Sequence, residues 1–183
     1  MQAIKNAETR MDKAIDALKR EFSVLRTGRA SAALLDNIKV DYYGAPTPIS
    51  QMAGITVPEA RQLVIKPYDK TILTSIERAI NEANIGLTPN NDGEVIRLNV
   101  PQLTEERRRE LAKKVKGFAE DAKVAIRNVR RDVNDELKKM QKNSEITEDA
   151  LKGHNDEVQK LTDKKIKEVD TVASEKEKDI MSI

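Results

Sequence analysis

The first 27 residues repeat hydrophobic side chains at the spacing of an amphipathic helix. Most of them recur at intervals of seven residues, with others four positions later, so that they share one helix face. The members of this face are Ile4, Ala7, Met11, Ala14, Ile15, Leu18, Phe22 and Leu25. Gly28 follows directly and is suited to ending the helix, because glycine readily adopts the left-handed conformation common there.

Residues 30–102 have a different pattern and hold all six prolines. Three runs of strand-forming residues, at 38–43, 62–66 and 94–100, are bounded by glycine, proline or asparagine. Residues 49–57 can supply one or two further strands. Between these runs, one helix is indicated by apolar residues on a single face, namely Ile72, Ile76, Ala79, Ile80 and Ala83. The segment therefore predicts a small α+β unit of about 70 residues.

The helical pattern returns at Thr104, a good N-cap that is followed by acidic residues where the helix dipole favours them. Apolar residues then recur every three or four positions as far as Met140, which predicts a helix of about 38 residues and ~57 Å. They include Leu111, Val115, Phe118, Ala122, Ala125, Val129 and Val133. Asn143-Ser144 ends this helix, and Thr147 caps another. Its apolar face comprises Leu151, Val158, Leu161, Val169, Val172 and Ile180.

Three long helices with one narrow apolar face each are expected to pack together, because none would be stable alone. The predicted fold class is α+β: a long antiparallel three-helix bundle (1–29 and 104–183) with an inserted small β/α/β domain (30–103). The chain crosses between the two domains near 29–31 and 101–104, which predicts a paired hinge. A plain helix stop at 27–29 is the alternative there. Since the three faces can satisfy one another, a monomer is expected.

The amino-acid composition excludes several classes of function. The chain has no cysteine, which excludes disulfides, thiolate metal sites and a cysteine nucleophile. No apolar run approaches a membrane span and no signal peptide is evident, so a cytoplasmic protein without a membrane partner is expected. His154 is the single histidine, and no catalytic or phosphate-loop motif is present. We therefore expect neither an enzyme nor a cofactor or bound metal. A structural protein or adaptor built from helices is one class of function that stays open.

Charge is concentrated in residues 103–143, which carry a net charge of +5 in a chain of net +2. Six cations at helical spacing form what we call the basic stripe: Arg109, Lys113, Lys116, Lys123, Arg127 and Arg130. Only Glu120 and Asn134 interrupt it, and Arg131 flanks it. The stripe is almost single-signed, whereas solvated faces usually mix charges to gain i,i+4 pairs, and it is predicted to point away from the bundle core. Arginine suits bidentate phosphate recognition, so the stripe indicates a surface that follows an RNA backbone, with a solvated helix face as the alternative.

Six segments, in order and along essentially the whole chain, resemble the ribosome recycling factor family. They are Arg26-Thr-Gly-Arg-Ala-Ser31, Asp41-Tyr-Tyr-Gly-Ala-Pro-Thr-Pro48, Pro101-Gln-Leu-Thr-Glu-Glu-Arg-Arg108, Arg127-Asn-Val-Arg-Arg-Asp132, Glu145-Ile-Thr-Glu-Asp149 and Val158-Gln-Lys-Leu-Thr-Asp163. Several matching blocks are more specific than one motif. Within the second block, Tyr42 and Tyr43 suit either strand packing or stacking on RNA bases.

The resemblance implies an L-shaped molecule that binds the large-subunit rRNA of a 70S-type ribosome after termination and no DNA. It also implies that elongation factor G and GTP drive subunit dissociation and release of mRNA and tRNA. Arg130 matches the principal RNA-contacting arginine of the family, and Arg26 and Arg29 match further basic positions. The implied rRNA-binding set is Arg26, Arg29, Arg109, Lys113, Lys116, Lys123, Arg127, Arg130 and Arg131. The implied hinge residues are Arg29, Ala30, Ser31, Pro101, Gln102, Leu103 and Thr104.

Overall fold

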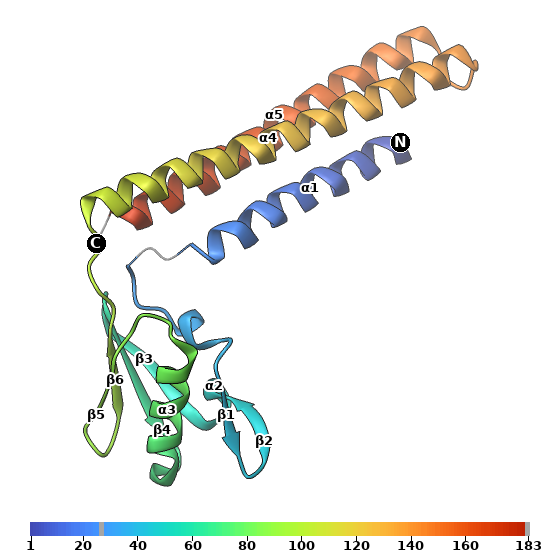
Figure 1. The fold of residues 1–183 in the computed structure, drawn as a ribbon. Helices are drawn as coiled ribbons and strands as arrows, with labels where there is room; N and C mark the ends of the chain where they lie inside the picture. The colour runs from blue at the N-terminus through green and yellow to red at the C-terminus, as the bar shows by residue number, and fades with distance from the viewer. Residues whose placement is uncertain (26–27, 182–183) are drawn as a thin grey trace. The chain divides into compact units, whose positions relative to one another are not determined.

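The computed structural model describes residues 1–25 and 28–181. Contacts divide the chain into two compact units. Unit 1 combines residues 1–26 with residues 105–182, and unit 2 comprises residues 27–104 (Figure 1). Each unit has its own hydrophobic core. Within the described residues, no helix is both long enough and apolar enough to cross a membrane.

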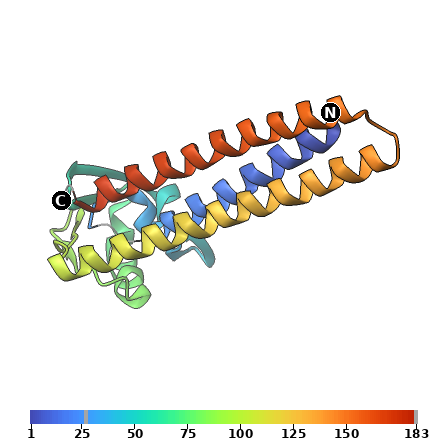
Figure 2. The same cartoon turned by 90° about the horizontal axis from the view of Figure 1, so that it is seen from above.

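Unit 1 is a bundle of three helices: α1 (Gln2–Ser23), α4 (Glu105–Lys142) and α5 (Glu148–Met181). Figure 2 shows them side by side, with α4 antiparallel to the other two. The pairing of Arg10 with Asp132 and of Phe22 with Phe118 fixes the antiparallel register of α1 on α4. The predicted three-helix bundle and the predicted insertion between its first and second helices are confirmed.

Helix α1 buries the face that its spacing predicts, including Met11, Ile15, Leu18 and Phe22, each at most 4% exposed. The helix ends at Ser23, four residues before the predicted end, so the predicted length was wrong by one turn. At this helix end the hydroxyl of Ser23 donates a hydrogen bond to the carbonyl of Arg20 at 2.6 Å. At this end of the bundle the ring of Phe22 meets that of Phe118 edge-on.

Helix α4 has 38 residues and begins directly after Thr104 with Glu105 and Glu106 in its first turn, as predicted. The break between α4 and α5 is also confirmed. Ser144 has a left-handed backbone (φ 59°), and the Thr147 hydroxyl accepts a hydrogen bond from the Ala150 amide at 3.1 Å to start α5. The buried face of α4 differs in detail, because Phe118 and Ala125 are only half-buried. Three fully or nearly buried positions, Ala119, Ile126 and Leu137, take their place.

Unit 2 combines a four-stranded antiparallel sheet, a separate two-stranded hairpin and one helix of eleven residues. The sheet order is β3-β4-β6-β5, and β1 pairs with β2. The elements in chain order are η1 (Ala32–Leu35), β1 (Lys39–Tyr42), β2 (Ala45–Pro48), α2 (Ile49–Met52), β3 (Ala53–Glu59), β4 (Gln62–Pro67), η2 (Lys70–Ile72), α3 (Leu73–Ala83), β5 (Pro89–Asn91) and β6 (Ile96–Asn99).

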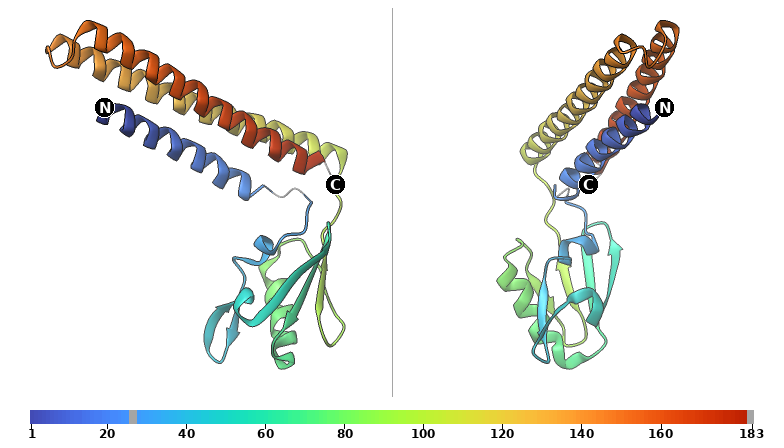
Figure 3. Two further views of the ribbon diagram at one scale, coloured as in Figure 1. Left: turned by 180° about the vertical axis from the view of Figure 1, so that it is seen from behind. Right: turned by 90° about the vertical axis from the view of Figure 1, so that its right-hand side faces the viewer.

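The core of unit 2 lies between α3 and one face of the sheet, an arrangement visible in Figure 3. Leu63 and Ile65 of β4 lie opposite Leu98 and Ile96 of β6, and all four are fully buried. Ile76 and Ile80 of α3, also fully buried, complete this cluster.

The predicted helix face was partly wrong. Ala83 is exposed, whereas Leu73, one turn before Ile76, is buried.

Two strands escaped prediction because both contain proline. Strand β2 holds Pro46 and Pro48, and β5 begins with Pro89. Each of these strands pairs with a single neighbour, β1 or β6, so it is an edge strand. Proline is tolerated on an edge because its missing N–H interrupts no ladder on the outer side.

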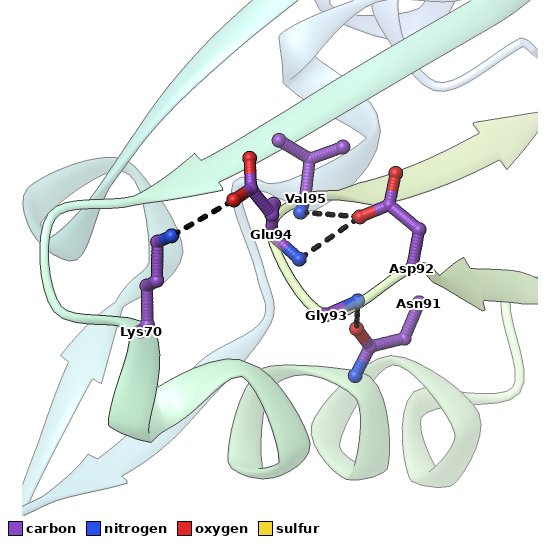
Figure 4. Close-up of polar contacts among 6 residues, drawn as sticks. All are labelled: Lys70, Asn91, Asp92, Gly93, Glu94 and Val95. Carbon is purple, nitrogen blue, oxygen red and sulfur yellow. Dashed lines mark hydrogen bonds and ion pairs between the residues drawn. The ribbon is translucent and has the colours of Figure 1, made fainter.

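The turn before β6 is built by two side chains that accept hydrogen bonds from the backbone (Figure 4). The amide oxygen of Asn91 accepts from the N–H of Gly93 at 2.8 Å. The carboxylate of Asp92 accepts from the N–H groups of Glu94 and Val95, each at 2.9 Å. These bonds confirm the turn predicted from this segment and explain why β6 starts where it does.

The two chain segments that enter and leave unit 2 are anchored to the turn between β3 and β4. The N–H of Ala30 donates to the carbonyl of Ala60 at 2.7 Å, and the N–H of Val100 donates to that of Arg61 at 2.8 Å. Ala30 is also buried in the unit 2 core. Ser31 caps η1, since its hydroxyl accepts from the N–H of Ala33. Ala30, Ser31 and Val100 are therefore held within unit 2.

Candidate nucleic-acid interface

The basic stripe runs along the flank of α4 that borders α5. Lys123 Nζ lies 2.5 Å from Asp170 Oδ1 of α5, and Arg130 Nη1 donates to the amide oxygen of Gln159, also of α5, at 3.5 Å. The Lys123 side chain is only 19% exposed. These two members therefore lie at the border of α4 with α5 and meet partners at the surface, and the prediction that the stripe points away from the bundle core stays a prediction.

Half of the basic stripe has acidic partners, although the stripe itself is almost single-signed. Arg109 lies 2.7 Å from Glu105 one turn earlier on α4. Two further cations are paired as well: Lys123 with Asp170, and Arg127 with Glu120 at 3.6 Å. The first pair has the i,i+4 spacing that was visible in the sequence. The Asp170 pair depends on the packing of α5 and had no sequence signal.

The remaining cations keep their charge available. Among the described residues, no carboxylate lies within 4 Å of the basic groups of Lys113, Lys116, Arg130 or the flanking Arg131. Lys113, Lys116 and Arg131 are exposed, and Arg130 is half-buried. A guanidinium or ammonium in this state can form a charge-assisted hydrogen bond with a phosphate oxygen. Within the basic stripe and its flank, these four residues are therefore the ones with charge available to an anionic backbone.

Arg130 is oriented by a neutral neighbour. Its partner Gln159 is itself held in place, because its side-chain amide donates to Asp163 Oδ1 at 2.9 Å. A neutral amide restricts the arginine side chain without cancelling its charge. The geometry thus presents a partly ordered guanidinium on a rigid helix.

The other residues of the implied rRNA-binding set lie elsewhere in the chain. Arg29 is exposed and belongs to unit 2. Arg26 lies outside the described residues. Tyr43 is 86% exposed at the end of the β1–β2 hairpin, whereas Tyr42 is half-buried against the unit 2 core. The two rings are edge-to-face with centroids 4.5 Å apart, so base stacking stays a prediction for Tyr43.

The predicted hinge residues lie outside helices and strands, and Leu103 of the second segment packs against Gly28, which directly precedes the first. Pro101, Gln102 and Thr104 are exposed, and Leu103 is half-buried. Gly28 has φ +76°, and a Cβ placed on it would lie 2.9 Å from Leu103 Cγ. The two segments are therefore packed side by side at this point, so a side chain at position 28 would displace Leu103.

A buried cation on α5 had no counterpart among the sequence predictions. Lys165 is 6% exposed, and its Nζ lies 2.6 Å from Asp12 Oδ1, with Glu168 at 3.6 Å and Glu8 at 3.9 Å. The hydrogen bond to Asp12 raises the pKa of Lys165, while burial opposes that shift. This cluster lies between α1 and α5 and is suited to fixing their register.

His154 lies close to a carboxylate of its own helix. It is half-buried on α5 with its Nδ1 3.5 Å from Glu157, one turn later. In the part of the chain that the structure describes, no group of three or more His, Asp or Glu side chains is arranged to hold a metal ion.

Comparison with known proteins identifies the family. The family model described as ribosome recycling factor matches residues 18–181. The ribosome-recycling factor of Geobacillus kaustophilus (strain HTA426) is 60% identical over 182 residues, which cover 100% of this chain and 98% of that protein. The factor of Staphylococcus saprophyticus is 61% identical over 180 residues, with 98% of each chain covered.

Comparison with solved structures gives the same family. The chain matches a solution structure of the ribosome recycling factor with a TM-score of 0.77 and 44% identity, covering 100% of this chain and 97% of that one. It also matches a model of the T. thermophilus ribosome recycling factor, bound with E. coli elongation factor G to the E. coli post-termination complex. That match has a TM-score of 0.65 and 42% identity over 98% of this chain and 97% of the other. The chain therefore belongs to the ribosome recycling factor family.

Proposed function

We propose that this protein binds the ribosome after termination and, with elongation factor G and GTP, promotes dissociation of the subunits and release of mRNA and tRNA. The support comes from the family and from the related structure bound to a post-termination complex together with elongation factor G. The protein acts as a monomer in the cytoplasm and makes no covalent change itself. Its contribution is binding energy coupled to motion.

Unit 1 supplies the contact with large-subunit rRNA in this proposal. The observation that carries it is the row of cations on α4 without acidic partners, formed by Lys113, Lys116, Arg130 and Arg131. Folded RNA is recognised largely by shape and backbone, and a long rigid helix can present several cations to successive phosphates. Arg26, Arg29, Arg109, Lys123 and Arg127 extend the proposed surface.

The hinge is proposed to lie at Gly28–Arg29 in the first segment and at Pro101–Thr104 in the second. Ala30 and Ser31 are proposed to move with unit 2, as Val100 does, since hydrogen bonds or burial hold all three there. Their role is to transmit movement to the β3–β4 turn as part of a rigid body. Unit 2 then swings when elongation factor G acts on the complex.

Splitting of post-termination ribosomes, followed by light scattering with elongation factor G and GTP, tests the proposal. The wild-type protein should lower the scattering as subunits separate. Arg130→Ala should slow this at subsaturating protein by about tenfold, since a charge-assisted hydrogen bond contributes about 1.5–3 kcal/mol. Arg20→Ala, which removes an exposed arginine from α1, is the matched control. Circular dichroism verifies that both variants fold.

A wild-type protein that neither binds nor splits ribosomes would refute the proposed function. Splitting by wild type with equal losses in Arg130→Ala and Arg20→Ala would keep the function but remove the special role of Arg130.

A further inference from the structure

Within the basic stripe, Lys123 already forms an ion pair with a carboxylate of α5. Lys123 Nζ and Asp170 Oδ1 are 2.5 Å apart, and the lysine side chain is only 19% exposed whereas that of the aspartate is 58% exposed. Other members are either free of acidic partners or paired within α4 itself. Among the described members of the stripe, Lys123 is therefore distinguished by a carboxylate supplied from another helix.

The surroundings of this pair carry further negative charge. A shallow groove between α4 and α5 is lined by two lysines and three carboxylates, together with small side chains: Lys116, Glu120, Lys123, Asp170, Ser174 and Glu177. Lys123 therefore has one carboxylate at 2.5 Å and shares its groove with two others. An incoming phosphate has to displace Asp170, in a groove that the carboxylates of Glu120 and Glu177 also line.

We propose that Asp170 is a built-in competitor of RNA phosphate for Lys123, and that it limits the affinity of the basic stripe for the ribosome. The inference rests on the proposed function and concerns regulation of the same surface. When RNA binds, Asp170 turns toward solvent, which its 58% exposure permits, and Lys123 exchanges one anion for another. That exchange adds much less binding energy than a free lysine would.

A limited affinity has a mechanistic use. Affinity changes within one interface act mainly on the dissociation rate. A factor that has to leave the ribosome after each round gains from a cation whose contact with phosphate is weakened by an internal rival. Glu120 competes less strongly with phosphate for Arg127. The two side chains are 3.6 Å apart on the same helix, and the arginine stays 40% exposed.

The experiment is a titration of ribosomes with wild type and Asp170→Asn at several salt concentrations. Asparagine keeps the shape of the side chain and removes its charge. The expected result is binding that is several-fold tighter and a plot of log affinity against log salt that is steeper by about one. Dissociation should be slower by a similar factor, and so should multiple-turnover recycling. Asp156→Asn, which removes one exposed negative charge elsewhere on α5, controls for net charge.

A double-mutant cycle locates the effect at Lys123. Lys123→Met should cost several-fold more affinity in the Asp170→Asn background than in wild type. Thermal unfolding of each variant verifies that the bundle is intact, and Asp170→Ser provides a second charge removal if the asparagine variant is unstable.

Two results would overturn the inference while leaving the proposed function in place. One is wild-type binding with no larger gain for Asp170→Asn than for Asp156→Asn. The other is weaker binding of Asp170→Asn, which would mean that Asp170 positions Lys123 for RNA. Absence of wild-type binding in the same titration would refute the proposed function, and this inference with it.

Discussion

The ammonium of Lys165 on α5 lies 2.6 Å from the carboxylate of Asp12 on α1, where the two helices pack. The Lys165 side chain is 7% exposed, whereas those of Asp12, Glu8 and Glu168 are between 43% and 49% exposed. The lysine is thus the desolvated member of the cluster, and the carboxylates retain water. This asymmetry predicts how each partner responds to substitution.

Removing Asp12 should be more harmful than removing Lys165. Asp12→Ala leaves a buried cation with only the more distant Glu8 and Glu168, and we expect the free energy of unfolding to fall by about 2–3 kcal/mol. Lys165→Met replaces the cation with an apolar side chain of similar length and leaves carboxylates that water can solvate, so a loss below about 1 kcal/mol is expected. Urea unfolding measures both, and the opposite order would contradict this reading of the cluster.

Stability should depend on Lys165 at alkaline pH. The pKa of Lys165 is raised above its ordinary value of 10.5, chiefly by the hydrogen bond to Asp12. A raised folded-state pKa means that the stabilisation is fully present below 10.5 and is lost as the pH rises through the folded value. Wild type should therefore lose stability above about pH 10.5.

Comparison with Lys165→Met isolates this contribution. The difference in free energy of unfolding between wild type and variant should decline with rising pH across that window. Burial lowers the pKa of Lys176, whose ammonium lies 3.5 Å from the carbonyl oxygen of Leu25. Its contribution therefore has the opposite sign, but Lys176 is present in both proteins and cancels in the difference. A difference independent of pH would exclude the proposed linkage.

Gly28→Ala should destabilise the protein more than Gly44→Ala. Both glycines have positive φ, 76° and 85°, so alanine is strained at either position by about 1 kcal/mol. Only at position 28 does the new Cβ meet a neighbour, Leu103 Cγ at 2.9 Å; at position 44 no atom lies within 4 Å. Thermal unfolding should show the larger fall in Tm for Gly28→Ala. Equal losses would mean that Leu103 moves aside without cost.

Asp92 should stabilise the turn before β6 only above strongly acidic pH. Hydrogen bonds from the N–H groups of Val95 and Glu94, and then from Arg97, lower the pKa of Asp92 from 3.8 to about 2. With a depressed folded pKa, the stabilisation is present above 3.8 and disappears as the pH falls through about 2. Asp92→Asn should speed amide exchange at Glu94 and Val95 at neutral pH. In wild type, the protection of these two amides relative to their intrinsic exchange rate should decrease as the pH falls through the acidic range. In Asp92→Asn this protection should depend much less on pH.

Asp36→Asn serves as the control for Asp92, since it removes an exposed carboxylate from the same unit without touching the turn. Faster exchange in both variants would show that net charge, rather than the Asp92 hydrogen bonds, protects these amides. A second ion pair, between Lys70 and Glu94 at 3.0 Å, is exposed on both sides and should contribute little to the same measurement.

Helix positions could be predicted because their causes are local. The N-cap at Thr147, the acidic first turns and the apolar spacing of α4 depend on residues within one or two helical turns. The strand runs at 62–66 and 94–100 were likewise bounded by proline and turn residues. Edge strands β2 and β5 could not be predicted, because proline in a strand is acceptable only where the outer side has no partner. Sequence alone does not reveal which strands lie at an edge.

In the basic stripe, some ion pairs could be predicted from the sequence and others depend on tertiary packing. Its spacing on α4, and the pair of Arg109 with Glu105, follow from helical geometry and were present in the sequence. The pairing of Lys123 with Asp170, 47 positions later, and the burial of Lys165 beside Asp12 exist only because α1, α4 and α5 pack in one register. By itself the sequence determined the long helices, the insertion of one unit within the other and the candidate cations. Tertiary packing decided which cations are neutralised, because charges interact through distances in space and not along the chain.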